Sequence, residues 1–92
     1  MGTLNRFDSV WDALESDPVK AENMKLRSAL MIAISEHIGE MGLTQAEAAK
    51  RLHITQPRVS ALTKGKIEEF RLDTLINMAH RLGLHVTMQI AA

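Results

Sequence analysis

The chain has 92 residues, of which 46% are hydrophobic and 24% are charged, with no cysteine and a formal net charge of zero. This length fits one small domain, and the composition is that of a globular protein rather than a disordered or membrane-embedded one. The lack of cysteine excludes disulfides, thiolate metal sites and cysteine nucleophiles, and it fits a reducing compartment. Because no export signal or membrane-spanning apolar run is recognisable, we expect a cytoplasmic protein.

The charges are unevenly distributed along the chain. Residues 1 to 43 carry four basic and seven acidic side chains, whereas residues 44 to 66 carry five basic side chains and one acidic side chain. A short basic window of this kind is typical of a surface that binds a polyanion. A solvated helix face gives the same pattern, so charge alone leaves both interpretations open.

Two helices are expected before residue 43. The first covers residues 8 to 15, and its apolar face consists of Phe7, Val10, Trp11 and Leu14. Asp17 followed by Pro18 is a strong start signal for the second, which should run to Met41 and end at Gly42. Apolar residues three and four positions apart predict its buried stripe, namely Leu26, Leu30, Ala33, Ile34, Ile38 and Met41, with Met24 and Met31 filling gaps in the core.

Two short helices should follow. Thr44 and Glu47 have the spacing of a capping box, which predicts a helix from Gln45 through Leu52. After a turn of about three residues, Thr55 can cap a further helix that runs to Lys64, with Gly65 in the left-handed conformation behind it. The apolar positions fit two helices that cross steeply: Ala48, Leu52, Ile54, Val59 and Leu62, with the small Ala49 at the crossing. This arrangement is a helix-turn-helix.

The C-terminal part combines a last helix with a possible strand. The helix is expected over residues 72 to 82 and ends at Gly83, and its inward residues are Leu75, Ile76, Ala79 and Leu82. Residues 84 to 90 alternate strictly between apolar and polar, which indicates a strand. Because no second strand is visible, this one needs a partner chain, and a frayed tail is the alternative.

The predicted fold is therefore mainly all-α, with a short C-terminal β-strand. Three parts are expected: an N-terminal segment with a short helix at residues 1–16, a helix-turn-helix DNA-binding domain at residues 17–83 with its motif at 45–64, and a dimerisation strand at residues 84–92. The strand would pair two copies through Val86, Met88 and Ile90.

The polar face of the helix expected up to Lys64 indicates what this protein binds. If Val59 and Leu62 face inward, Gln56, Ser60 and Lys64 share the opposite face, with Arg58 and Thr63 on its flanks. The side chains of Gln56, Ser60 and Arg58 can bond to base edges in a DNA major groove. Four residues at helix ends are expected to contact phosphates and set the register: Gln45, Thr55, Lys64 and Lys66.

The sequence LTQAEAAKRL at residues 43–52 and ITQPRVS at residues 54–60 resemble the helix-turn-helix of the Xre/Cro-repressor family over residues 24 to 82. The resemblance is closest to small HigA-type antitoxins, through residues 7–14, residues 26–28 and the C-terminal strand. It implies a lambda-repressor-like fold, a homodimer on an inverted-repeat operator in double-stranded DNA, repression of its own operon, and a toxin partner. Gln45 and Gln56 match the first residue of each motif helix, where the family contacts DNA. A phage-type or host repressor with no toxin is the alternative.

Two residues depart from the family pattern. His53 stands in the turn where the family usually has glycine, so the turn either holds a left-handed histidine or changes its geometry. Pro57 replaces a polar base-reading residue of many relatives, and we expect it to make an apolar base contact instead, for example to a thymine methyl group.

Other functional classes find no support in the motifs. The four histidines lack the spacing of metal ligands, the serines have no nucleophile-elbow sequence around them, and the five glycines form no phosphate-binding loop. We therefore predict no enzymatic activity, no metal and no cofactor.

Overall fold

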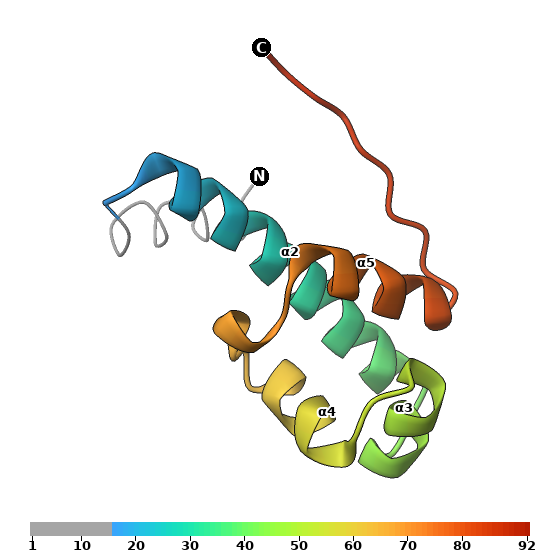
Figure 1. Cartoon of the computed structure of the whole chain (residues 1–92). Helices are drawn as coiled ribbons and strands as arrows, with labels where there is room; N and C mark the ends of the chain where they lie inside the picture. Colours follow the sequence, from blue (N-terminus) through green and yellow to red (C-terminus); the bar gives the residue numbers. More distant parts are fainter. Residues whose placement is uncertain (1–15) are drawn as a thin grey trace.

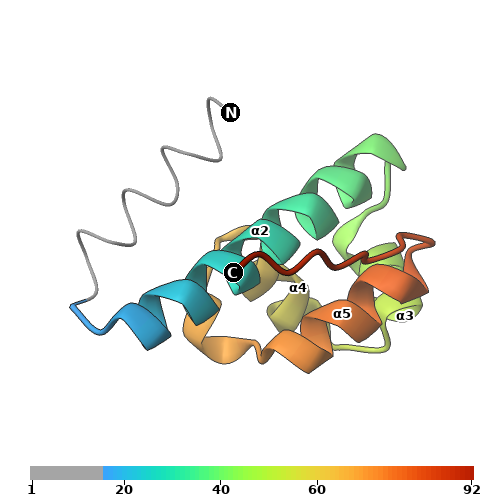
Figure 2. The same cartoon turned by 90° about the horizontal axis from the view of Figure 1, so that it is seen from above.

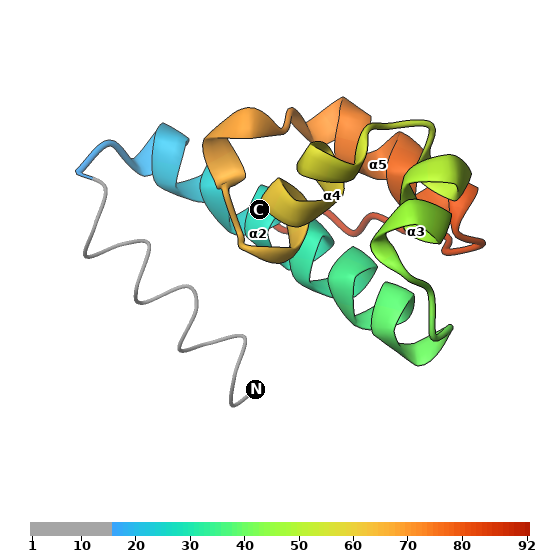
Figure 3. The same ribbon diagram turned by 90° about the horizontal axis from the view of Figure 1, so that it is seen from below.

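The computed structural model describes residues 16 to 92, so the helix expected over residues 8 to 15, with Trp11, lies outside the described residues. The described part of the chain forms α2 (Pro18–Glu40), α3 (Gln45–Leu52), α4 (Gln56–Thr63), the 3-10 helix η1 (Ile67–Glu69) and α5 (Leu72–Arg81). The long α2 lies along one side of the molecule, α5 crosses beside it, and α3 and α4 gather at the end that lies opposite the C-terminus (Figure 1). The view from below shows α3 and α4 exposed on one side of this arrangement (Figure 3).

The helix ends fall where the sequence signals placed them. The Asp17 side chain accepts a hydrogen bond from the Val19 amide at 3.0 Å, and Pro18 follows as the first helical residue of α2. Gly42 and Gly65 both have positive φ angles, of 66° and 74°, just beyond the ends of α2 and α4. These left-handed residues reverse the chain at little steric cost, so each helix stops and the next can pack against it.

The core lies where α2, α3, α4, η1 and α5 meet. Its largest fully buried side chains are Phe70, Ile34, Leu52, Leu62, Leu75, Met78 and Val59. Met31 is also buried, which confirms its predicted role as a core residue. Contacts between α2 and α5 and between α3 and α4 dominate the packing, so α2 and α5 form the base on which the α3–α4 pair is mounted.

The predicted stripe of α2 is wrong at two positions. Leu26 is 50% exposed and Ala33 is exposed, whereas Ser28 is buried. At 3.6 residues per turn, Leu26 and Ala33 lie on the far side of the helix from Met31 and the residues that α4 and α5 cover. Apolar residues occur on both sides of α2, and the position of its neighbours decides which side becomes the core.

The last helix shows the same kind of difference. Leu75, Ala79 and Leu82 are buried as predicted, but Ile76 is 37% exposed and Met78 takes its place in the core. Ile76 instead faces the C-terminal segment across a hollow beside α5.

The expected C-terminal strand is absent from the described residues 16 to 92. After Gly83, the chain runs as an extended segment away from the end of α5 (Figures 1 and 2), anchored at its start by a 2.9 Å hydrogen bond from the Leu84 amide to the Ala79 carbonyl. Its alternating apolar residues Val86, Met88 and Ile90 are exposed. A strand requires a neighbouring strand to pair its backbone groups, and no segment of the described chain lies in position to do so.

Candidate nucleic-acid interface

A reciprocal capping box fixes the start of α3. The Thr44 amide donates to Glu47 Oε1 at 2.9 Å, and the Glu47 amide donates to Thr44 Oγ1 at 3.1 Å. The hydrogen bonds from the Thr44 amide and hydroxyl lower the pKa of the Glu47 carboxyl below its ordinary value of 4.5. The predicted capping box is confirmed, and Gln45, the first residue of α3, is exposed.

The turn between α3 and α4 contains a left-handed histidine. His53 has φ 58° and ψ 41°, close to the ideal left-handed conformation, and among residues 16 to 92 it is the one residue other than glycine with positive φ. The Ile54 amide bonds to the Ala49 carbonyl at 3.0 Å and so closes α3. Of the two predicted possibilities for this turn, the left-handed histidine is correct.

A side chain from α5 holds this turn in place. Arg81 Nη1 lies 2.8 Å from His53 Nδ1. Arginine can only donate, so His53 accepts through a neutral ring nitrogen at this contact. The bond ties the turn of the motif to the last residue of α5.

The inner sides of α3 and α4 pack as the spacing predicted. Ala48, Leu52, Val59 and Leu62 are buried, and Ala49, at the crossing of the two helices, is 7% exposed. Thr55 caps α4 through a 3.4 Å hydrogen bond from the Arg58 amide to its hydroxyl. Packing on one side and capping at the start therefore fix which side chains α4 presents outward.

The residues selected from the sequence differ in how far they are exposed. Gln56 and Pro57 are exposed in the first turn of α4, and Arg58 and Ser60 are partly buried beside them. All four expected phosphate contacts are exposed: Gln45, Thr55, Lys64 and Lys66. A shallow hollow of about 500 Å³ between α3 and α4 is lined by Gln56 together with Lys50, Ile54, Ala46, Glu47 and Ala49.

Lys50 is a residue that the site prediction missed. It stands on the exposed side of α3 and lines the hollow beside Gln56. The sequence could have indicated it, because Lys50 follows Ala46 by one helical turn and lies on the side of α3 opposite the buried Leu52.

Comparison with known proteins identifies the motif. A family model described as "Helix-turn-helix domain" matches residues 15–91. A solved structure named "Putative XRE Family Transcriptional Regulator" is 36% identical, with a TM-score of 0.74 over 79% of this chain and 82% of that chain. The chain belongs to the XRE family of helix-turn-helix transcriptional regulators. A search among curated proteins gives no match.

Membership of the XRE family confirms the coarser predictions. The family consists of DNA-binding regulators and not of enzymes, in agreement with the interpretation of residues 44 to 66 and with the prediction of no enzymatic activity. Residues 16 to 92 of this XRE-family protein contain no group of three or more side chains placed to hold a metal ion. In the same residues, no helix has the length and hydropathy that a membrane crossing requires.

The positive charge of the motif is not neutralised within the described chain. The ion pairs seen among residues 16 to 92 join Lys25 to Glu22 and Arg71 to Asp73, and neither involves the basic residues between 44 and 66. Those residues are Lys50, Arg51, Arg58, Lys64 and Lys66. The face of this XRE-family protein that carries Gln45 and Gln56 is therefore electrostatically suited to a polyanion.

Arg58 makes one contact that the sequence did not indicate. Its guanidinium carbon lies 4.6 Å from the centroid of the Phe70 ring, which belongs to the core just after η1. Twelve residues separate the two in sequence, and no local signal links a residue of α4 to an aromatic ring beyond the next turn. Arg58 is consequently directed toward the η1 side of α4, away from the hollow that Gln56 lines.

Proposed function

We propose that this protein is a sequence-specific repressor whose helix α4 enters the major groove of an inverted-repeat operator. The observation that carries the proposal is the capped start of α4, where Gln56 and Pro57 are exposed on a rigid helix pair whose basic side chains form no ion pairs within the described chain. A helix held in this way presents its first-turn side chains to base edges.

The proposed contacts follow from the chemistry of each side chain. Gln56 bonds to adenine, Pro57 packs against a thymine methyl group, and Arg58 and Ser60 bond to a base edge or the adjoining backbone. Gln45, Thr55, Lys64 and Lys66 bind phosphates on either side and set the register. Repression then results from occupation of a promoter that polymerase also needs.

In the first experiment, purified protein selects duplexes from a random pool at near-physiological salt. Footprinting then locates the protected bases, and binding is measured to the DNA upstream of the gene that encodes this protein. We expect an inverted repeat to be enriched and the same repeat to be protected upstream of the gene. Equal, weak binding of all duplexes would refute the proposal. With the selected duplex, Gln56→Ala should cost roughly 1 to 3 kcal/mol and flatten base preference. Asn23→Ala, which removes an exposed amide from α2, is the matched control and should change nothing.

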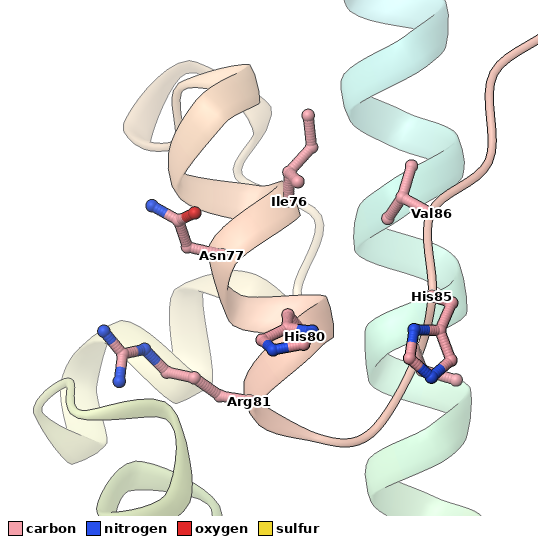
Figure 4. A pocket seen from close by; sticks show the side chains of 7 residues that line it. Ile76, Asn77, His80, Arg81, His85 and Val86 are labelled. Carbon is pink, nitrogen blue, oxygen red and sulfur yellow. The ribbon is translucent and has the colours of Figure 1, made fainter.

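We propose that the repressor is a homodimer paired through residues 84–92. Val86, Met88 and Ile90 alternate with polar residues in a segment without Asp, Glu, Lys or Arg, so two copies can pair without bringing like charges together. The segment stands off α5, with Val86 across from Ile76 and the His85 ring beside His80 (Figure 4). A second copy would supply the missing strand partner and cover these apolar side chains.

Sedimentation tests this dimer. Met88 is 82% exposed, so Met88→Lys should leave the fold intact, yet it should weaken the dimer because it buries a charge in the interface. Val19→Lys, at a residue of α2 that is 77% exposed, is the matched control and should remain dimeric. A Met88→Lys protein as dimeric as the wild type would place the interface elsewhere. In the dimer, the two α4 helices should lie about 34 Å apart or a multiple of it.

We further propose that the repressor is the antitoxin of a toxin–antitoxin operon. The resemblance of residues 7–14 and 26–28 to HigA-type proteins, and the acidic sequence from Phe7 to Asp17 with Trp11, support this proposal. A phage-type or host repressor with no toxin remains the competing function. Co-expression with the product of the adjacent gene separates them: an antitoxin should co-purify with that product and relieve growth arrest, whereas a growth-neutral neighbour that does not bind would refute the antitoxin role.

A further inference from the structure

Phe70 occupies an unusual place between the core and the candidate interface. Its backbone is extended after η1, and its ring is one of the largest fully buried side chains, with 1% exposed. The same ring lies against the guanidinium of Arg58, which is only partly buried. One aromatic side chain therefore connects the hydrophobic core to a proposed DNA contact.

The backbone around this ring is fixed from the other side of the molecule. Arg27, on α2, donates from Nη1 to the Ile67 carbonyl at 3.3 Å and to the Phe70 carbonyl at 3.4 Å. These two carbonyls bracket η1, and the Phe70 amide bonds back to the Ile67 carbonyl at 3.3 Å. The hydrogen bonds from Arg27 thus tie the backbone that carries the ring to α2, the longest of the described helices.

We propose that Phe70 is a positioning residue for DNA recognition, which holds Arg58 in one orientation before DNA arrives. A free arginine side chain populates many rotamers and loses that freedom when it binds, whereas contact with an aromatic ring restricts them in advance. A guanidinium carries five N–H donors, and its contact with an aromatic ring does not use them in hydrogen bonds to oxygen or nitrogen, so donors remain for a guanine edge or a phosphate. This inference rests on the proposed function, because it takes Arg58 as a DNA contact.

A double-mutant cycle on the selected duplex tests the proposal. Phe70→Leu removes the ring but keeps an apolar side chain, and it should weaken binding about 2- to 10-fold. In an Arg58→Ala background the same change should have no further effect. Met78→Ala, at a buried residue of α5, is the control for core damage and should have the same effect on binding in both backgrounds. All affinities are measured at a temperature where unfolding curves show each variant to be folded.

A second measurement does not involve DNA. The order parameter of the Arg58 Nε–H group, measured by NMR on the free protein, should fall in Phe70→Leu and stay near the wild-type value in Phe70→Tyr, which keeps the ring. If Phe70→Leu fails to fold, the unbranched Phe70→Met replaces it in both measurements. The Tyr variant should also retain wild-type affinity.

The outcomes separate this inference from the proposed function. If no duplex is enriched, or if Arg58→Ala binds as tightly as the wild type, the DNA role assigned to Arg58 fails and the positioning role fails with it. If Arg58→Ala weakens binding but Phe70→Leu acts equally in both backgrounds, the DNA role stands and Phe70 is only a core residue. An unchanged Arg58 order parameter in Phe70→Leu would overturn the positioning role in the same way.

Discussion

The left-handed His53 allows a sharp test of the turn between α3 and α4. Replacement by alanine or by glycine removes the ring, and with it the bond from Arg81, in both cases. The two variants then differ in their backbone preferences alone. At φ 58° and ψ 41°, the left-handed conformation destabilises the alanine variant, whereas glycine adopts it without strain.

The magnitude follows from two opposing contributions. The left-handed conformation costs an L-residue roughly 1 to 2 kcal/mol, and the greater entropy of glycine in the unfolded chain offsets roughly 0.5 to 1 kcal/mol of the advantage. His53→Gly should therefore be more stable than His53→Ala by about 0.5 to 1 kcal/mol, which corresponds to a melting temperature higher by a few degrees, on the order of 2 to 8 °C.

Thermal unfolding and urea titration measure the difference in stability between His53→Gly and His53→Ala. The same pair of substitutions at Glu36 is the control, and there the order of stability should be reversed. Glu36 is exposed in the interior of α2, where the backbone is right-handed. There the alanine variant should be more stable than the glycine variant by about 1 kcal/mol. If alanine is as stable as glycine at position 53, or more stable, while the control pair behaves as expected, the turn does not hold a left-handed residue and the account given for the motif is wrong.

Four further predictions concern the cap, the core and the proposed phosphate contacts. Thr44→Ala should cost about 1 kcal/mol of unfolding free energy. In urea titrations at several pH values, wild type should be more stable than Glu47→Gln above pH 4.5, and this difference should disappear as pH falls through the lowered pKa of Glu47. A difference in stability that does not change with pH would contradict the cap. Leu75→Ala, at a fully buried position, should cost about 2 to 5 kcal/mol in the same assay, and a loss below about 1 kcal/mol would contradict its burial. Lys64→Ala should weaken binding to all duplexes alike and reduce the salt dependence by about one phosphate, so an unchanged slope would remove Lys64 from the contacts.

The parts of the fold that the sequence predicted are those encoded within one or two helical turns. The capping box joins residues three apart, and the Asp17 and Thr55 caps bond to amides two and three residues away. Such contacts depend on local spacing, so they can be identified without knowledge of the fold. The outward residues of α4 followed in turn from the inward positions of Val59 and Leu62.

The errors concern contacts that depend on distant elements. Leu26 and Ile76 have the spacing of core residues, but whether a helix buries one apolar side or the other depends on where its neighbours lie. The contact of Arg58 with Phe70 needs η1 to bring residue 70 back under α4, and the hydrogen bonds from Arg27 reach carbonyls 40 and 43 residues away. None of these partners lies within reach of a periodicity argument. The strand expected at residues 84–90 differs in kind, because the alternation is visible in the sequence but a strand also needs a pairing partner, and none lies among the described residues.

A short path connects the proposed dimer segment to α4. Arg81 is the last residue of α5, and its bond to His53 reaches the turn before α4, two residues ahead of Thr55, the cap of that helix. Beyond Arg81, the chain passes through Leu82, which is buried, directly into the segment that would pair two copies. An operator with two half-sites requires a fixed separation of the two α4 helices, and this separation is only as rigid as the link between pairing segment and turn. Glycine at position 53 would relax the backbone but remove the acceptor for Arg81. Histidine is thus the better residue at position 53 if the Arg81–His53 bond stabilises the dimer by more than the left-handed conformation destabilises the monomer.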